Sequence, residues 1–480
     1  MYNNSNVGRK ENQSKIGLIS LRLIIRDNMF ENKKIFVFGM ARSGYAASTF
    51  LAKHAASILV TDSKEQDIEK VKKLNELGVE VAITKEPEEL LDETYDVIVK
   101  NPGIPRNHPL LQKAKKLKIP VVGEIEVASY YLDKTVHVIG VTGSNGKTTT
   151  VTILYEFMKE QGLPVHLAGN IGTPLCEIIE DVKPGDYLVL EVSDHQLYDL
   201  YHFKTNVSVV TNLSEVHLDF NGTFENYLNT KKRIFQNHTK HDIAVLNLDN
   251  QHVMDISKDI PSKKVFFSSM NQEADAYVQN RYIYIHGEPF IELSDIRVQG
   301  MHNYENIMCA ILATLPFGVT KETIKRVLNN FGGVEHRLEF VDKIEDKTFY
   351  NDSKSTNNEA TITALNSFQQ PVVLIMGGLE RGQDFHELDD SMNHVRVVIA
   401  LGETKERIQT YCQEIGKDCI LVNTIEEAVH AGFDLASPQD IILLSPACAS
   451  WDMFPSFEVR GEEFKKQIDI LKKERENVKN

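Results

Sequence analysis

The stretch GVTGSNGKTTT, residues 140–150, joins an apolar run to a segment whose apolar residues recur at helical spacing. The apolar run is residues 136–139 and the helical segment is residues 151–158, so the pattern predicts a strand, a glycine loop and a helix. Backbone amides at such a helix N-terminus face a bound phosphate. In this arrangement Lys147 supplies positive charge and Thr148 offers a hydroxyl to Mg²⁺. The stretch therefore predicts binding of a nucleoside triphosphate.

The glycines of this loop depart from strict P-loop spacing. Gly140 and Gly146 enclose residues 141–145, which is one residue too many, whereas Gly143 and Gly146 lie too close together. A chance cluster of glycines in a turn is the alternative interpretation. The Lys-Thr pair at a strand-to-helix junction favours the nucleotide interpretation.

Length and composition bound the protein class. A chain of 480 residues is too long for one core and predicts roughly two to four domains. The formal net charge of -15 argues against a nucleic-acid partner. The five cysteines show no CxxC spacing, and no apolar stretch is long enough to span a membrane. We therefore expect a cytoplasmic protein without structural zinc and without integral membrane association.

The first 30 residues form a separate segment. Residues 1–15 are polar, and the apolar residues 16–25 are interrupted by Arg22 and lack a small-residue cleavage site, which argues against a signal peptide. A second methionine, Met29, precedes the first strand pattern. We expect residues 1–30 to be a disordered or dispensable extension, with a short membrane-surface helix as the alternative.

The first α/β unit begins with a strand at residues 34–38, a turn at 39–44, a helix at 45–56 and a strand at 57–61. A glycine turn followed by Asp62 resembles a dinucleotide-binding fingerprint. Ala41 stands where that fingerprint has its middle glycine, which weakens an NAD interpretation. A strand running into a Pro/Gly loop at residues 96–105 should end the sheet, and residues 121–126 look like a boundary.

The second unit contains acidic and histidine side chains at the ends of strands. A buried strand at residues 186–191 ends at Glu191, where such folds hold Mg²⁺, although a solvated carboxylate is the alternative. His217 follows another strand that begins at residue 207. Further strands are expected at 242–249 and 282–285, and a helix from residue 300.

The third unit is a further α/β series. Strands are expected at residues 371–376, 395–400, 419–422 and 440–444, and helices at 405–415, 426–435 and 462–479. The last helix is strongly charged, which is typical of a solvated terminal helix.

The loop at residues 140–150 resembles that of the Mur ligases and of their relative folylpolyglutamate synthase. Other stretches point to the same family: GNIG (169–172), VLEVS (189–193), HNYEN (302–306), EHR (335–337) and NDSKST (351–356). Three more resemble the D-glutamate-adding branch: GGLERG (377–382), LSPACASWD (444–452) and FEVRG (457–461). The similarity extends over residues 33–470, and the missing Asp-Asn-Pro-Arg motif disfavours the diaminopimelate-adding branch.

The resemblance implies an α/β fold with three domains: a UDP-binding Rossmann-like domain at residues 31–123, a central P-loop ATPase-like domain at 124–333 and an amino-acid-binding Rossmann-like domain at 334–480. It implies an ATP-dependent ligase of peptidoglycan precursor synthesis, which adds D-glutamate to UDP-N-acetylmuramoyl-L-alanine through an acyl phosphate. It also implies a monomer. Another amide ligase of the superfamily, with a different amino acid or a folate, is the nearest alternative; an NAD-dependent dehydrogenase and a non-catalytic nucleotide switch are weaker ones.

The resemblance also implies roles for single residues. ATP would be bound by Gly143, Ser144, Asn145, Gly146, Lys147, Thr148, Thr149, Asn303, Asn306, Arg337 and Asp352. Two Mg²⁺ ions would be held by Thr148, Glu191, His217 and Lys231, the last carbamylated by CO₂. Without the resemblance, Lys231 would be assigned to an exposed basic helix face. The UDP substrate would contact Ser43, Asp62, Asn170 and Ser193, and D-glutamate would contact Lys354, Thr356, Arg381, Ser450 and Phe457, with Lys354 also catalytic.

The chain departs from the family pattern at three positions. Asp194 and His195 stand where the family often has Ser-Phe, and Val216 stands where many relatives have an acid. None of these differences removes an expected metal ligand.

Overall fold

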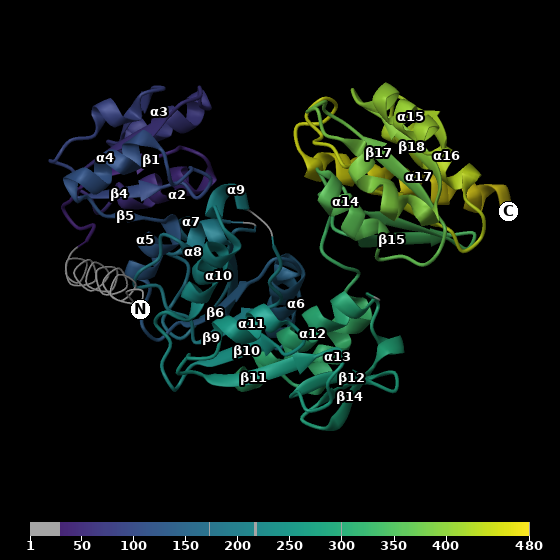
Figure 1. Ribbon diagram of the computed structural model, residues 1–480, viewed down its shortest axis with the longest axis horizontal. Helices are drawn as coiled ribbons and strands as arrows, with labels where there is room; N and C mark the ends of the chain where they lie inside the picture. Colours follow the sequence, from purple (N-terminus) through teal and green to yellow (C-terminus); the bar gives the residue numbers. More distant parts are fainter. Residues whose placement is uncertain (1–28, 172, 216–217, 299, 480) are drawn as a thin grey trace, which may run out of the picture. The chain divides into compact units, whose positions relative to one another are not determined.

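The computed structural model describes residues 29–171, 173–215, 218–298 and 300–479. The described chain forms three α/β sheets with helices packed around them (Figure 1), which confirms the expected fold class. It divides into two compact units, one of residues up to 295 together with 301–327, and one of residues 296–300 together with 328 onward. The expected extension at residues 1–30 lies outside the described residues except for Met29 and Phe30, which are both buried.

The first sheet is parallel and has five strands, in the spatial order β3 (Glu80–Ile83), β2 (Ser57–Asp62), β1 (Lys34–Phe38), β4 (Val97–Lys100) and β5 (Val121–Val122). Its flanking helices are α2 (Arg42–Leu51), α3 (Ile68–Glu76), η1 (Pro87–Leu90) and α4 (Pro109–Leu117). The expectation that the strand before residue 105 ends this sheet is wrong. Strand β5 continues the sheet, and with two residues it is too short to produce a recognisable pattern.

Helix α2 starts at Arg42, three positions before the expected start, because Gly44 lies inside its first turn. A Cβ on Gly44 would stand 1.8 Å from the carbonyl oxygen of Gly39. The glycine therefore serves close packing of the helix against the preceding turn and does not mark a break in the helix.

The second sheet has nine strands. Their spatial order is β14 (Glu288–Glu292), β13 (Tyr282–Ile285), β12 (Ala276–Gln279), β11 (Lys263–Ser268), β10 (Ile243–Asn247), β9 (Val207–Val210), β6 (His137–Thr142), β8 (Tyr187–Glu191) and β7 (Val165–Gly169). The strands from β12 to β7 are parallel, and β13 and β14 extend the edge as antiparallel strands. The carboxyl ends of the parallel strands therefore share one edge, where ligands bind in open α/β sheets.

The longer helices of this part are α6 (Lys147–Glu160), α10 (Phe224–Lys232), α12 (Met301–Thr314) and α13 (Lys321–Asn330). Shorter ones are α7 (Leu175–Ile178), α8 (Asp194–Leu197), α9 (Leu218–Asn221), η2 (Arg233–Phe235), α11 (Gln251–Ile256), η3 (Leu293–Asp295) and η4 (Leu315–Phe317). In the described part of the chain, none of the helices has the length and apolar character needed to cross a membrane.

The third sheet has six strands, in the order β15 (Glu339–Ile344), β16 (Lys347–Asn351), β20 (Ile441–Leu444), β17 (Val372–Gly377), β18 (Val395–Leu401) and β19 (Asp418–Leu421). Only β15 pairs antiparallel among these described strands. The helices are α14 (Asn358–Leu365), η5 (Phe385–His394), α15 (Lys405–Glu414), α16 (Ile425–Leu435) and α17 (Phe457–Lys479).

Helix α17 begins at Phe457, five positions before the expected start, because Gly461 weakens the helical pattern. A Cβ at this position would stand 2.2 Å from Nδ1 of His336. Glycine is thus required by the close approach of the segment around residue 336, at the cost of some helix propensity.

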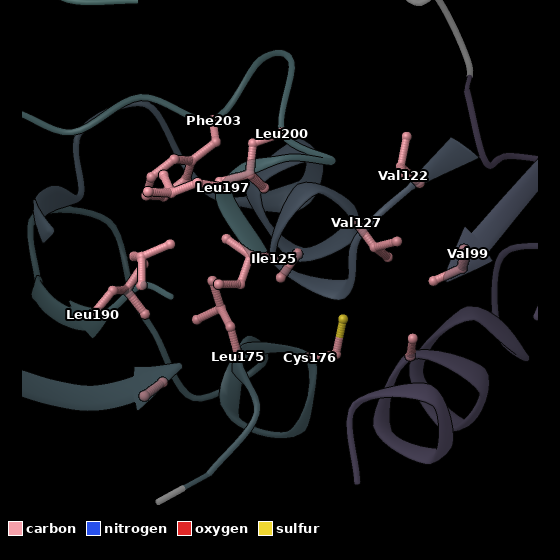
Figure 2. Close-up of a cluster of buried hydrophobic side chains, with 14 of the residues drawn as sticks. Val99, Val122, Ile125, Val127, Leu175, Cys176, Leu190, Leu197, Leu200 and Phe203 are labelled. Carbon is pink, nitrogen blue, oxygen red and sulfur yellow. The ribbon is translucent and has the colours of Figure 1, made fainter. Parts of the chain in front are cut away.

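Helix α5 (Glu124–Tyr131) joins the first and second sheets through one hydrophobic cluster. Figure 2 shows Ile125 and Val127 of α5 between Val99 of β4 and Leu190 of β8, with Leu175 of α7 alongside. Each of these side chains is at most 1% exposed. Burial of one such side chain stabilises the fold by roughly 1.5–3 kcal/mol. Since Val122 and Ile125 belong to this cluster, the boundary region expected at residues 121–126 is part of a hydrophobic core.

The first residue of α5, Glu124, is a carboxyl group inside this core. It is 2% exposed, and its Oε1 accepts a hydrogen bond from the backbone N–H of Cys176. Burial raises the pKa of Glu124 to about 7. The reason is that a surrounding of low polarity disfavours the charged form.

We expect Glu124→Gln to stabilise this part of the protein at neutral and higher pH. Between pH 4.5, the ordinary pKa, and pH 7 an unfolded chain has lost this proton while the folded chain keeps it, so wild-type stability falls as pH rises. The full effect is about 3 kcal/mol. Urea unfolding at several pH values should show the advantage of the variant growing across this window. A difference between the two proteins that is the same at every pH would contradict the explanation.

Candidate active site

Two glycines give the loop between β6 and α6 its shape. Gly143 has φ +151° and Gly146 has φ +80°, conformations that side chains disfavour. A Cβ on Gly143 would stand 2.0 Å from Oγ1 of Thr211, and one on Gly146 would stand 2.3 Å from Oδ1 of Asn306. Both positions therefore require glycine on grounds of space as well as backbone conformation.

Hydrogen bonds from the neighbouring strand end hold the loop. The backbone N–H of Ser144 donates to the carbonyl of Asn212 (2.8 Å), and that of Asn145 donates to Asn212 Oδ1 (2.9 Å). The Ser144 hydroxyl lies 2.7 Å from the hydroxyl of Tyr227. The loop is thus anchored to the segment after β9 and to α10.

Lys147, the first residue of α6, lies over the loop. Its Nζ donates to the carbonyl oxygens of Gly143 (3.0 Å) and Ser144 (2.7 Å). The ammonium group and the N-terminus of α6 therefore both belong to this loop. This arrangement is suited to a phosphate group.

Beside the loop, buried oxygen atoms converge. The hydroxyl of Thr148 donates to Oε2 of Glu191 (2.8 Å), and Asn170 Nδ2 donates to Oε1 of the same carboxylate (2.8 Å). Glu191 is 2% exposed, which is not compatible with the alternative of a solvated carboxylate at a strand end. A carboxylate and a hydroxyl next to a phosphate loop are the kinds of oxygen ligand that Mg²⁺ takes.

Lys231 of α10 is buried beneath the loop. It is 1% exposed, and its Nζ donates to Thr142 Oγ1 and to the carbonyl of Gly143, both at 3.1 Å. Burial, and then the charge of Lys147, lower the pKa of Lys231 to about 7, although Asp194 at 3.8 Å acts in the opposite direction. The exposed basic helix face that the sequence pattern indicates at this position is therefore wrong.

Asp194, at the start of α8, is a buried anion next to Lys231. Asn221 Nδ2 donates to its Oδ2 (2.8 Å), and His195 Nδ1 lies 3.5 Å from its Oδ1. Burial opposes ionisation, but His195, Lys231 and Asn221 together hold the pKa of Asp194 well below its usual range. This position is one where the chain departs from the family pattern. His217 and Val216 lie outside the described residues.

The expected adenine-contacting residues belong to helix α12. Asn306 Oδ1 accepts a hydrogen bond from Thr150 Oγ1 (3.3 Å) and stands next to Gly146. Asn303 lies one turn earlier on the same helix. Thr149 is on the first turn of α6. Asn306 and Thr149 therefore lie beside the loop, and the adenine contacts of Asn303 and Asn306 stay predictions.

A cavity of about 250 Å³ lies between the strand ends of the first sheet and those of the second. Ser43 and Asn170, both expected to bind the UDP substrate, line it. Asp62 instead accepts a hydrogen bond from the backbone N–H of Met40 (2.8 Å) and so supports the turn before α2. Ser193 caps α8 through a hydrogen bond from the N–H of Gln196. Asn170 thus links the cavity to Glu191.

In the compact unit that contains residue 328 onward, Asp352 is buried behind the segment around residue 337. Its carboxylate accepts hydrogen bonds from the N–H of Leu338 (3.1 Å) and the hydroxyl of Ser445 (2.7 Å). Burial raises the pKa of Asp352 to about 6, while Arg337 nearby acts to lower it. These two expected ATP contacts therefore lie close to one another in this unit.

Four of the expected D-glutamate residues lie in loops that follow strands of the third sheet, namely Lys354, Thr356, Arg381 and Ser450, and Phe457 is the first residue of α17. The Lys354 ammonium lies 5.8 Å from the ring centre of Phe457, and the Arg381 guanidinium lies 4.8 Å from that of Trp451. Thr356 is half-buried. Ser450 is buried, and among the described residues its hydroxyl has no hydrogen-bond partner, so it is able to serve a ligand.

Sequence reasoning missed Arg460, which organises these loops. It is 2% exposed and donates to Ser353 Oγ (2.9 Å), to the carbonyl of Ser353 (2.8 Å) and to that of Cys448 (3.1 Å). It thereby ties the NDSKST segment to the LSPACAS segment. The FEVRG stretch at residues 457–461, which resembles the D-glutamate-adding branch, includes this arginine but does not indicate that it is buried.

One further cluster has ligating side chains but already contains a cation. Glu335, His336 and Glu462 place one ligand atom each within 4.8 Å of one another. The ammonium group of Lys465 lies 2.6 Å from Glu335 and 2.7 Å from Glu462. The cluster is therefore an ion-pair network that ties α17 to the segment before β15.

Models of three sequence families match the parts of the chain that form the three sheets. The Mur ligase MurD-like N-terminal domain matches residues 33–123, the Mur ligase middle domain matches 141–314, and the Mur ligase glutamate ligase domain matches 336–448. The chain belongs to the Mur ligase family. It is therefore an ATP-dependent ligase, and the dehydrogenase and nucleotide-switch alternatives are disfavoured.

Named relatives of this Mur ligase match it along almost its whole length. It is 43% identical over 448 residues to UDP-N-acetylmuramoylalanine–D-glutamate ligase of Geobacillus kaustophilus, covering 92% of this chain and 99% of that protein. It is 42% identical over 446 residues to the ligase of the same name from Bacillus cereus strain G9842, covering 92% and 98%.

Solved structures share the fold of this Mur ligase. UDP-N-acetylmuramate–alanine ligase of Thermotoga maritima has a TM-score of 0.59 and 16% identity, covering 92% of this chain and 100% of that one. The MurF ligase of Thermotoga maritima, solved with ADP, has a TM-score of 0.53 and 18% identity, covering 92% and 99%. The expected three-domain Mur ligase architecture is confirmed.

Proposed function

We propose that this Mur ligase joins the amine of D-glutamate to the L-alanyl carboxylate of UDP-N-acetylmuramoyl-L-alanine, with conversion of ATP to ADP and phosphate, in peptidoglycan precursor synthesis. The observation that carries the proposal is 40–43% identity over 92% of the chain to ligases of that name. The P-loop residues and the cavity described above supply groups that suit such a reaction.

The first chemical step activates the carboxylate, which is a poor acyl donor. A carboxylate oxygen attacks the γ-phosphorus of ATP, ADP leaves, and an acyl phosphate forms. Lys147 and the amides at the N-terminus of α6 neutralise charge on the transferred group, and the fixed loop orients it. Positioning and charge neutralisation contribute most to such a transfer.

Two Mg²⁺ ions form part of the proposal. Thr148 and Glu191 would hold the first, since they offer a hydroxyl and a buried carboxylate beside the loop. When bound, Mg²⁺ supplies positive charge that stabilises the transferred phosphoryl group. His217 and Lys231 would hold the second. A lysine with a pKa of about 7 is partly neutral at physiological pH, which suits reaction of its amine with CO₂ to give an anionic carbamate and a proton.

In the second step the amine of D-glutamate attacks the acyl carbon, an amine proton is released, and the C–O bond to phosphate breaks. We assign recognition of D-glutamate to Lys354, Thr356, Arg381, Ser450 and Phe457. The cations among them suit the carboxylates of this amino acid. Arg337 and Asp352 would contact ATP, together with Asn303 and Asn306. Ser43, Asp62, Asn170 and Ser193 would serve the UDP substrate.

We assign UDP binding to residues 31–123, ATP binding to residues 124–333 and D-glutamate binding to residues 334–480. A monomer that acts in the cytoplasm completes the proposal.

An amino-acid selectivity assay tests the function. With ATP, Mg²⁺ and UDP-N-acetylmuramoyl-L-alanine present, we expect phosphate release that depends on D-glutamate, while L-alanine and diaminopimelate give at most about 1% of that rate. Equal or faster release with another amino acid would assign the chain to a different branch of amide ligases. A folate substrate in place of the UDP substrate serves as the control for folylpolyglutamate synthase activity.

A further inference from the structure

Arg106 connects the first sheet to the centre of the second. It lies in the loop between β4 and α4, and its guanidinium stacks on the ring of Tyr198 (3.5 Å to the ring centre) and approaches that of Phe220 (4.5 Å). Its Nη2 donates to Oδ1 of Asn221 (3.0 Å) and approaches Thr230 Oγ1 (3.4 Å). The flat guanidinium is therefore fixed by two ring faces and by two oxygen acceptors.

Asn221 has both ends of its amide in use. Its Oδ1 accepts from Arg106, and its Nδ2 donates to Oδ2 of Asp194 at 2.8 Å. Arginine can only donate hydrogen bonds, so the amide oxygen must face Arg106 and the NH₂ group must face Asp194. Arg106 thereby sets the orientation of the Asn221 side chain. This asparagine is 3% exposed, so solvent offers no substitute partner.

Asp194, which Asn221 holds in place, forms an ion pair with Lys231. Its second oxygen, Oδ1, lies 3.8 Å from Lys231 Nζ, and both side chains are buried. Arg106 also approaches Lys231 by a shorter route, since Thr230 directly precedes it on α10. Two connections therefore run from one side chain of the first sheet to the lysine beneath the phosphate loop.

The loop that carries Arg106 also faces the cavity. Asn101 and Pro102, at the start of this loop, line that cavity together with Ser43 and Asn170. A substrate that binds in the cavity and contacts Asn101 or Pro102 therefore contacts the same short loop that carries Arg106. The segment therefore contacts both the cavity and the surroundings of Lys231.

We propose that Arg106 is a positioning residue of this ligase: through Asn221 and Asp194 it holds Lys231 beside the phosphate loop, and so couples the cavity to the metal-binding and phosphate-binding groups. The inference rests on the proposed function, because it takes Lys231 to be one of the metal-binding groups. Groups that orient metal ligands typically change metal affinity or activity by about 10–100-fold when they are removed.

The test uses the full chain and measures Mn²⁺ binding in the presence of ADP by electron paramagnetic resonance, alongside steady-state kinetics. Asn221→Asp keeps the acceptor for Arg106 but replaces the donor toward Asp194 by a second acceptor. Arg106→Lys keeps the charge but not the planar contact with Tyr198 and Asn221. We expect each variant to weaken Mn²⁺ binding and to lower kcat by about 10-fold. Methylguanidinium should partly restore an Arg106→Ala variant.

Lys53→Ala is the matched control. It removes an exposed ion pair between the turn after α2 and Glu180, which follows α7, at 53% and 60% side-chain exposure. We expect its Mn²⁺ binding to equal that of the wild type. Wild-type Mn²⁺ affinity in both Arg106→Lys and Asn221→Asp would overturn the inference, even if their thermal stability fell. Failure of the wild-type protein to use D-glutamate would instead refute the proposed function, and the Mn²⁺ comparison would still report on Arg106.

Discussion

Replacing Lys147 by alanine is expected to lower kcat/KM by about 10³-fold, since loss of a preorganised charge-stabilising group costs about 4 kcal/mol of transition-state stabilisation. The ammonium group lies within 3.0 Å of the carbonyl oxygens of Gly143 and Ser144, and alanine leaves no charge at this position. Initial rates of D-glutamate-dependent phosphate release measure the effect. Nucleotide affinity, followed by calorimetry with ADP, should also fall.

Lys159→Ala provides the comparison for this variant. Lys159 is on the same helix, α6, at its other end, and its side chain is 60% exposed. We expect less than a twofold change in kcat/KM for it. An activity loss shared by both variants would indicate damage to α6 and would remove the support for a phosphate-binding role of Lys147.

Glu191→Gln should lower kcat/KM by about 10²-fold, the second largest effect. The substitution keeps the shape of the side chain and one acceptor oxygen, which can still accept from Asn170 Nδ2, while the hydroxyl of Thr148 must rotate to accept from the new NH₂ group. It removes the negative charge that would face Mg²⁺. A 10²-fold loss in kcat/KM corresponds to about 3 kcal/mol of transition-state stabilisation, which we attribute to the charge of this carboxylate acting through Mg²⁺. The rate should be measured over a range of Mg²⁺ concentrations, because the half-activating concentration should rise.

The control is Glu177→Gln, an exposed glutamate on α7. Its Mg²⁺ dependence should match that of the wild type. If Glu191→Gln showed wild-type Mg²⁺ dependence with a reduced rate, the carboxylate would support the fold of the site and not a metal ion.

The strands were predictable because long apolar runs are typical of parallel sheets buried on both faces. Strands β1 and β13 occupy the predicted residues, and β2, β8, β18 and β20 differ from the prediction by one residue at one end. The sequence did not predict the described strands β3, β7, β11, β12, β14, β15 and β16, several of which are short or lie at a sheet edge. Strand β5 and the start of α17 were missed for physical reasons. Two residues carry no periodicity, and Gly461 is present for its contact with His336, which is distant in the sequence.

The phosphate loop was predictable for a similar reason, since its ligands come from one continuous segment. Lys231 was not, because a basic residue on a polar helix is typical of a solvated face until its neighbours are known. The link from Arg106 to Asn221 spans 115 positions in the sequence, and that from Asn221 to Asp194 spans 27. No local pattern indicates contacts of this kind. The roles assigned to single residues therefore remain predictions for the experiments above.

Formation of an acyl phosphate is the central claim, and isotope transfer tests it most directly. UDP-N-acetylmuramoyl-L-alanine labelled with ¹⁸O in both carboxylate oxygens is incubated with ATP and D-glutamate, and the released phosphate is analysed by mass spectrometry. We predict that each phosphate carries one ¹⁸O atom, because the oxygen that attacks the γ-phosphorus leaves with it. Unlabelled phosphate, or AMP that carries the label, would contradict the mechanism.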